Sequence, residues 1–218
     1  MSATISKLTP SALSALLCAR ICHDLISPVG ALSTAIEILD DESNSDMHAD
    51  ALDLVRNSSK QANAKLKFLR LAFGAGGSAP GIIGVAEIQS LTSDMFAQGK
   101  ANLQWQMLDD GIDKNQARLL LNMIMLGMQA VPRGGDVIIS QLEKTDGATE
   151  LVVAATGPRA RLDAAVERTL IGKAPEDGFD GRSIQPFYAG MMAREMSGSV
   201  SAVLAEETVT IKAVLPAA

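Results

Sequence analysis

The first third of the chain contains two long stretches in which apolar residues recur at intervals of three and four. One runs from about residue 10 to residue 39, the other from about residue 47 to residue 73, and the polar run 40–46 separates them. This spacing places the apolar side chains on one face of an α-helix. Thr9 and Pro10 suit the N-cap and the first turn of the first helix. The sequence therefore predicts a helical hairpin, each helix about 40 to 48 Å long at 1.5 Å per residue.

Two helices of this length cannot bury such wide apolar stripes against each other alone. An antiparallel hairpin leaves two flanks exposed, and a second hairpin would cover them. We therefore expect dimerisation into a four-helix bundle. The alternative is that the remainder of the chain covers the exposed flank.

The composition changes at residues 74–84, where a glycine-rich run can sustain neither helix nor strand. We place a domain boundary there, with a helical domain at residues 1–76 and a second domain at residues 82–218. In the second domain helices alternate with strands that mostly form hairpins, which predicts an α+β fold with one mixed sheet and helices on one face. The expected helices are 85–98, 113–131, 161–170 and 186–196, and the expected strands are 101–108, 137–143, 151–155, 199–205 and 208–215.

Charge and composition exclude several classes of partner. The net charge of -6 argues against nucleic acid, because phosphate binding needs clustered Lys and Arg. No run approaches 18 uncharged apolar residues, and the N-terminus lacks the layout of a signal peptide, so we expect neither a membrane span nor secretion. The two cysteines are then expected to be free thiols in a reducing cytoplasm.

Residues 20–28, Arg-Ile-Cys-His-Asp-Leu-Ile-Ser-Pro, contain the strongest candidate site. His23 is one of two histidines, and an imidazole nitrogen can act as a nucleophile. Asp24 could hold the ring and accept its proton. On a helix, Arg20 and Ser27 share a face with His23. This arrangement could seat a phosphoryl group, although Arg20 could equally form an intrahelical ion pair and Ser27 could bond back to the helix.

Pro28 and the cysteines each allow two interpretations. Pro28 has no N–H for the carbonyl of Asp24 and clashes with it, so the helix should bend beside the histidine; the alternative is a plain kink without a function. Cys18, Cys22 and His23 raise the question of a metal. Zinc needs about four ligands and the chain has no other cysteine, so we expect no metal site.

The segment from His23 to Pro28 resembles the phosphoacceptor box of the two-component histidine kinases. In that box an acidic residue follows the histidine and a proline stands five residues after it. The resemblance implies a dimeric phosphoacceptor hairpin followed by a histidine-kinase ATPase-like α/β sandwich. Whether the second domain can bind ATP then becomes the deciding question.

Three nucleotide-binding motifs of the kinases are altered in the second domain. Asn122 matches the first family asparagine before the Pro-x-Gly-Gly turn, but Leu126 replaces the asparagine that binds Mg²⁺, a cation that needs oxygen ligands. Ala155 and Arg159 replace the aspartate and last glycine of the adenine-reading loop. The glycine-rich lid falls on residues 183–186, Ser-Ile-Gln-Pro, which lack its glycines. We therefore expect a degenerate ATPase-like domain that binds neither nucleotide nor metal.

A phosphoacceptor histidine joined to such a domain resembles the ChpT-type histidine phosphotransferases, as does the segment 187–190. The resemblance implies a cytoplasmic homodimer that carries a phosphoryl group on histidine in a phosphorelay of cell-cycle regulation. The group would pass between the receiver domain of a hybrid kinase (CckA-like) and those of response regulators (CtrA-like and CpdR-like). His23 would react through Nε2, Asp24 would orient the ring, and the receiver would supply Mg²⁺.

Two arginines of the second domain complete the candidate site. Arg159 and Arg161 lie where nucleotide phosphates would lie in an active relative, and they could grip the acidic surface of a receiver; the alternative is a solvated loop. Two other functions remain open at this point. One is an ATP-binding histidine kinase whose shifted motifs still work, and the other is a scaffold that binds receivers without phosphoryl transfer.

Overall fold

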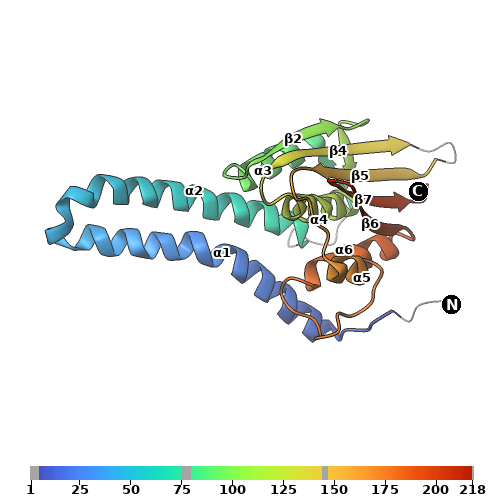
Figure 1. Cartoon of the computed structure of the whole chain (residues 1–218), viewed down its shortest axis with the longest axis horizontal. Coiled ribbons are helices and arrows are strands. Elements are labelled where there is room, and N and C mark those ends of the chain that lie inside the picture. The colour runs from blue at the N-terminus through green and yellow to red at the C-terminus, as the bar shows by residue number, and fades with distance from the viewer. Residues whose placement is uncertain (1–4, 75–79, 144–146, 218) are drawn as a thin grey trace.

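The computed structural model describes residues 5–74, 80–143 and 147–217 of the chain. A helical hairpin projects from one side of an α/β domain, and the base of the hairpin packs into that domain (Figure 1). The α+β architecture expected from the sequence is confirmed.

The hairpin consists of α1 (Pro10–Asp40) and α2 (His48–Ala72), joined by a 3₁₀ turn, η1 (Glu42–Met47). Thr9 caps α1 as expected, since its hydroxyl accepts a hydrogen bond from the backbone N–H of Ala12 at 3.2 Å. Both helices therefore begin and end close to the predicted positions.

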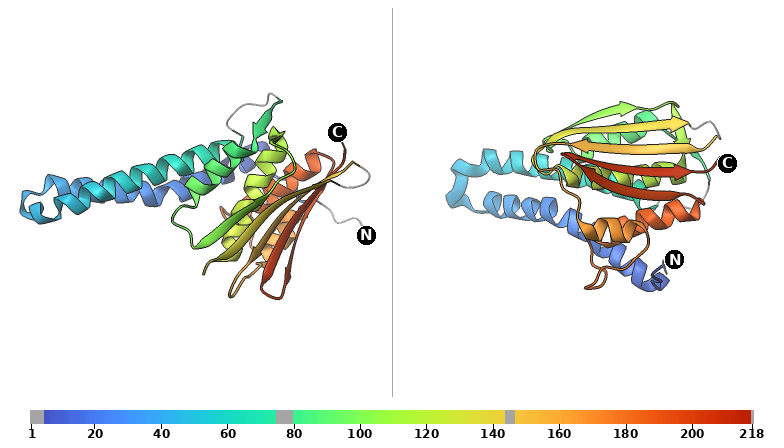
Figure 2. Two further views of the ribbon diagram at one scale, coloured as in Figure 1. Left: turned by 90° about the horizontal axis from the view of Figure 1, so that it is seen from above. Right: turned by 45° about the vertical axis from the view of Figure 1, so that its right-hand side comes forward.

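The α/β domain is built on a five-stranded sheet in the order β2-β4-β5-β7-β6. β2 runs parallel to β4, and the other neighbouring pairs are antiparallel. The helices lie on one face of this sheet (Figure 2). The strands are β2 (Ala101–Gln106), β4 (Gly135–Glu143), β5 (Thr149–Thr156), β6 (Ser199–Ala205) and β7 (Thr208–Leu215), and the helices are α3 (Val85–Met95), α4 (Lys114–Ala130), α5 (Ala164–Leu170) and α6 (Ile184–Glu195).

Several features differ from the sequence-based expectations, among them the end of α3, which lies at Met95 rather than at residue 98. A second, two-stranded sheet pairs β1 (Ile82–Gly84) with β3 (Gly111–Asp113); each strand has three residues, too few to show an alternating pattern. α5 begins at Ala164 rather than at residue 161, because Asp163 is its N-cap. The domain boundary near residue 76 and most of the turn 144–147 lie outside the described residues, and the division at residues 76 and 82 stays a prediction.

The hairpin and the α/β domain share one hydrophobic core. α4 runs through its centre, with every residue from Leu119 to Gly127 buried. Phe68, Leu69 and Ala72 at the end of α2 belong to the same cluster. Because this packing fixes the base of the hairpin, the middle of α1 is held beside the α/β domain.

Candidate phosphotransfer site

His23 is presented to solvent from the middle of α1. Its side chain is 67% exposed, and its Nδ1 atom lies 3.3 Å from Oδ1 of Asp24. A carboxylate at Nδ1 favours the tautomer that carries its proton there. In that tautomer Nε2 has the free lone pair, so the ring can act as a nucleophile through Nε2.

Asp24 is held far more firmly than the histidine it contacts. Its side chain is only 12% exposed, and Oδ2 forms an ion pair with Nε of Arg20 at 3.1 Å. Arg20 is itself buried, with 9% of its surface exposed. A buried carboxylate is stable when a cation compensates its charge. Arg20 therefore fixes the position of Asp24, which agrees with the intrahelical ion pair considered from the sequence.

The backbone carbonyl of Asp24 is bonded by a residue that the sequence did not indicate. Pro28 lies inside α1 and has no N–H to donate to this carbonyl. Lys65 on α2 donates from Nζ to the same oxygen at 2.9 Å. α1 changes direction along its length (Figure 1), as is expected of a helix that contains a proline. The sequence indicates that the carbonyl of Asp24 lacks its helical donor. Which residue replaces that donor follows only from the register of α1 against α2.

The other residues predicted near His23 differ in their surroundings. Ser27 is exposed, and its hydroxyl has no hydrogen-bond partner among the described residues, so it does not bond back to the helix. Pro28 is buried. Cys18 and Cys22 are exposed free thiols. Within the described part of the chain, no group of three or more His, Cys, Asp or Glu side chains could hold a metal ion.

Arg159 and Arg161 lie in the loop between β5 and α5, where the backbone N–H of Arg161 donates to the carbonyl of Ala130 at the end of α4. Both are exposed, and neither side chain has a hydrogen-bond or ion-pair partner among the described residues. Arg159 adopts a left-handed backbone conformation with φ of 62°. The structure thus leaves both guanidinium groups available for an external partner without joining them to His23.

The residues that would surround a nucleotide do not fit Mg²⁺-ATP. Asn122 is fully buried and donates from Nδ2 to the carbonyl of Ala72 at 2.9 Å. Gln185 in turn donates to the backbone and side-chain oxygens of Asn122 at 2.9 and 3.2 Å. Leu126 and Ala155, which are 5% and 0% exposed, offer no side-chain ligand. Through these bonds Asn122 of α4 connects the end of the hairpin with α6.

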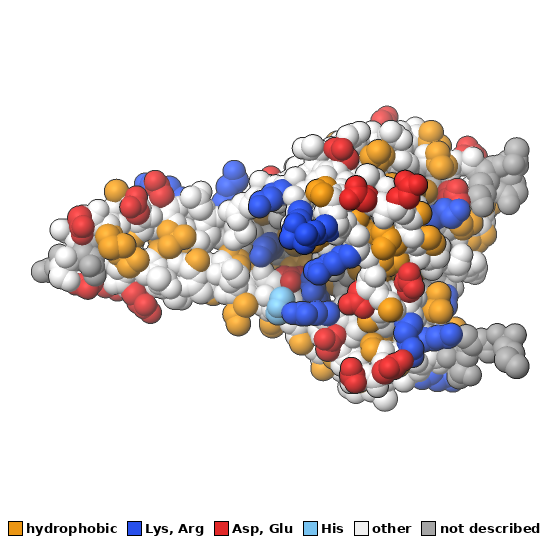
Figure 3. Space-filling view, in the orientation of Figure 1, with side chains coloured by type: hydrophobic (Ala, Val, Ile, Leu, Met, Phe, Trp, Pro, Cys, Tyr) orange, Lys and Arg blue, Asp and Glu red, His pale blue; other side chains and the backbone are white. Residues whose placement is uncertain are grey.

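Positive charge gathers near the histidine despite the acidic composition of the chain. Figure 3 shows Lys and Arg side chains around a hollow where the hairpin meets the α/β domain, with a histidine at its edge. Arg20, Lys65 and Lys100 line this hollow. Such a field favours the approach of a phosphorylated, acidic surface.

Comparison with known proteins agrees with this geometry. Residues 85–208 match the family model described as the histidine phosphotransferase C-terminal domain. This match covers more than half of the chain, which therefore belongs to the histidine phosphotransferase family and is a phosphotransferase.

Individual relatives extend the similarity over almost the whole chain. The protein is 37% identical over 201 residues to protein phosphotransferase ChpT of Brucella abortus (strain 2308), covering 92% of this chain and 94% of that protein. It is similar to a solved bacterial phosphotransferase with a TM-score of 0.84 and 32% identity, covering 97% of this chain and 100% of that chain. The histidine kinase AdeS of Acinetobacter baumannii aligns at a TM-score of 0.48 and 13% identity over 89% of this chain and 97% of that chain.

The bond from Lys65 to the Asp24 carbonyl should stabilise the fold because Pro28 is present. We expect Lys65→Met to lower the free energy of unfolding by about 1 to 2 kcal/mol, the range of a partly buried hydrogen bond to a charged donor. In a Pro28→Ala background, the new N–H at position 28 can pair with the carbonyl, and the cost of Lys65→Met should fall below about 0.5 kcal/mol. Urea denaturation of the four proteins of this cycle measures the coupling.

Lys67→Met is the matched control, because Lys67 is an exposed lysine of the same helix. Its cost should stay within about 0.5 kcal/mol. Equal costs of Lys65→Met with and without Pro28 would show that the two residues do not act on one carbonyl.

Proposed function

We propose that this protein relays phosphoryl groups through His23 between aspartates of receiver domains. The observation that carries the proposal is an exposed histidine whose Nδ1 faces Asp24 and whose Nε2 is free. In the domain behind it, Leu126 stands where the kinases have the asparagine that binds Mg²⁺, and Asn122 is bonded to the carbonyl of Ala72. A phosphoryl group then has to come from another protein, as it does in a relay.

The proposed reaction is a direct exchange of one phosphoryl group between two residues. The lone pair of Nε2 attacks the phosphorus of an aspartyl phosphate, the P–N bond forms, and the P–O bond to the aspartate breaks. The aspartate leaves as a carboxylate, and the positive charge that develops on the ring is stabilised by Asp24 across Nδ1. Delivery to a second receiver is the reverse sequence of steps. Such transfers depend on positioning and on neutralising charge. Mg²⁺ held by the receiver would neutralise the charge of the phosphoryl group.

The remaining candidate residues take supporting roles in this proposal. Arg20 acts through Asp24, since its Nε is committed to that carboxylate. Pro28 frees the Asp24 carbonyl for Lys65, and so places the ring relative to α2. The hydroxyl of Ser27 is exposed and can contact the incoming phosphoryl group or receiver. Arg159 and Arg161 would bind the acidic surface of the receiver.

The partners follow from the family rather than from any feature of this chain alone. We propose the receiver of a CckA-like hybrid kinase upstream and CtrA-like and CpdR-like response regulators downstream, in a cytoplasmic phosphorelay of cell-cycle regulation. The relative from Brucella abortus is named a protein phosphotransferase, which supports transfer between proteins. The basic hollow beside His23 suits acidic receivers.

Removing the proposed nucleophile should abolish transfer without disturbing the fold. When a receiver phosphorylated on aspartate is mixed with the protein, we expect label to move to the wild type and to His48→Ala, but not to His23→Ala. The exposed position of His23 predicts a change in unfolding free energy within about 0.5 kcal/mol for His23→Ala. Phosphate-affinity gels and thermal denaturation measure the two properties.

Labelled ATP alone separates this proposal from a kinase. Autophosphorylation of the purified wild type from ATP would contradict the relay proposal. Transfer to His23→Ala at the wild-type rate would exclude His23 as the acceptor, and intact signalling by that variant in cells would favour a scaffold.

We also propose that two copies pair through the hairpin. Large apolar side chains on the hairpin remain exposed. Three on α1 and two on α2 repeat at helical spacing on one face of their helix, whereas Leu54 of α2, 36% exposed, lies on another side. α1 is long and apolar enough to cross a membrane by length and composition, and only 11% of its most apolar window is buried. Because α1 and α2 cover only one side of each other, their exposed apolar faces need another partner. The hairpin of a second copy would cover them and complete a four-helix bundle. The residues of these two faces are Ile26 at 71%, Val29 at 50% and Ile36 at 51% on α1, and Leu52 at 43% and Leu66 at 53% on α2.

A charge in this face should dissociate the dimer. We expect sedimentation of the wild type at micromolar concentration to give twice the chain mass of 22.8 kDa, and Ile36→Glu to give the mass of one chain. Val203→Glu is the matched control, since Val203 is 58% exposed on strand β6 of the α/β domain. A monomeric wild type, or a dimer unaffected by Ile36→Glu, would contradict the bundle.

A further inference from the structure

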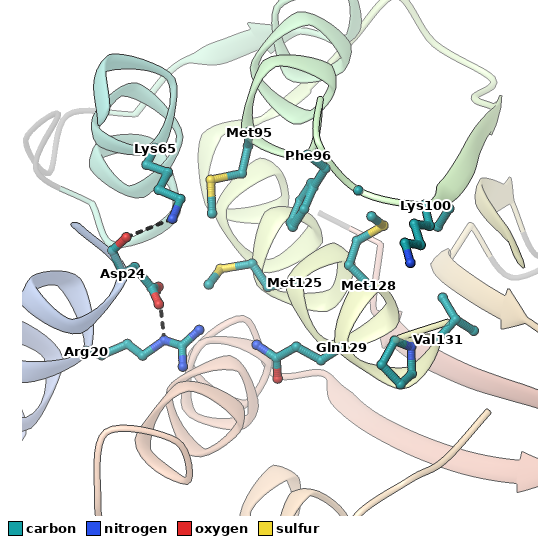
Figure 4. A pocket seen from close by; sticks show the side chains of 13 residues that line it. Arg20, Asp24, Lys65, Met95, Phe96, Lys100, Met125, Met128, Gln129 and Val131 are labelled. Atoms are coloured by element: carbon teal, nitrogen blue, oxygen red, sulfur yellow. Dashed lines mark hydrogen bonds and ion pairs between the residues drawn. The ribbon is translucent and has the colours of Figure 1, made fainter. Parts of the chain in front are cut away.

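The hollow between the hairpin and the α/β domain is a defined cavity of about 250 Å³. We call it the Arg20–Lys100 pocket, after the cations at its two ends. Residues from α1, α2, α3 and α4 and from the loops that follow α3 and α4 contribute to its wall (Figure 4). Its volume lies just below the range of about 300 to 1,000 Å³ usual for drug-sized ligands, so it suits a smaller molecule.

One side of the pocket is apolar and adaptable. The thioethers of Met95, Met125 and Met128 point into it beside the ring of Phe96 (Figure 4). Phe96 is fixed by an edge-on contact with Phe68, with ring centroids 5.8 Å apart. Methionine side chains adjust to ligands of different shape. This side can therefore bury the apolar body of a small molecule.

The cations of the pocket have unused hydrogen-bond donors. Arg20 is only 9% exposed, yet only its Nε atom has a partner, in the ion pair with Asp24. Its two terminal nitrogens have no partner among the described residues and face Gln129 across the pocket (Figure 4). Lys100 has no hydrogen-bond or ion-pair partner in the described part of the chain. The lining residues thus include three cations, Arg20, Lys65 and Lys100, and one carboxylate, that of Asp24.

We propose that the Arg20–Lys100 pocket binds a small organic monocarboxylate with an apolar body. The planar guanidinium of Arg20 matches a carboxylate through two parallel hydrogen bonds, and the net positive charge of the rim favours a single anion. The apolar body lies on the methionine and phenylalanine side chains. A molecule of this class has a carboxylate for the unpaired donors of Arg20 and an apolar body for the methionine side.

Binding would couple to the histidine through Asp24. A carboxylate bound to the terminal nitrogens of Arg20 shares the charge of the guanidinium with Asp24 and weakens their ion pair, and Asp24 positions the ring of His23. The ligand should consequently slow phosphoryl transfer. This consequence, unlike binding itself, rests on the proposed function.

The test uses octanoate and the full-length protein labelled with ¹³C at its methionine methyl groups. We expect saturable shifts of the Met95, Met125 and Met128 signals, with the signal of Met47 at the hairpin tip unchanged. Lys100→Glu should weaken octanoate binding by at least about fivefold, because it replaces an attractive charge by a repulsive one. Lys173→Glu, at another exposed lysine, should bind octanoate like the wild type.

Several results would overturn the proposal. They are an absence of shifts, shifts spread equally over all the methionines, and binding that Lys100→Glu leaves unchanged. Shifts of the same three methyl groups by a receiver domain, with none by octanoate, would assign the pocket to protein docking instead. Octanoate that binds as expected but leaves transfer from a phosphorylated receiver at its normal rate would overturn only the coupling to Asp24.

Discussion

The arrangement of the site depends on Asp24, which is bonded at both its carboxylate and its backbone carbonyl. Arg20 pairs with one carboxylate oxygen, His23 lies against the other, and Lys65 from the second helix takes the carbonyl. The side chain of Asp24 is only 12% exposed, and these partners compensate its charge and its polar atoms. The buried carboxylate of Asp24 therefore orients the ring of His23, while the ring itself stays exposed to an incoming partner.

The α/β domain supports this arrangement through packing. Asn122 and Gln185 form a buried polar network that also accounts for the carbonyl of Ala72 at the end of α2. α6 approaches α5 closely at Gly190, where a Cβ atom would lie 2.0 Å from the carbonyl oxygen of Leu170. These contacts make the α/β domain the base that holds the hairpin. The basic hollow lies where the two parts meet.

Much of this could be predicted from the sequence because the signals were local. The periodicity of the hairpin, the cap at Thr9 and the adjacency of His23 and Asp24 are set by neighbours in the chain. The strands β1 and β3 were missed because three residues show no alternation. Lys65, 41 residues after Asp24, could not be identified before the register of α1 against α2 was known. The same holds for the pocket, since its lining comes from elements far apart in sequence.

The central claim is that His23 accepts the phosphoryl group on Nε2 because Asp24 holds the proton of Nδ1. The most direct measurement is ³¹P and ¹⁵N spectroscopy of ¹⁵N-histidine-labelled protein after phosphorylation by a receiver. The account predicts one phosphohistidine, with the phosphorus coupled to Nε2 of His23. Phosphorus coupled to Nδ1, or carried by His48 or a residue other than histidine, would contradict it.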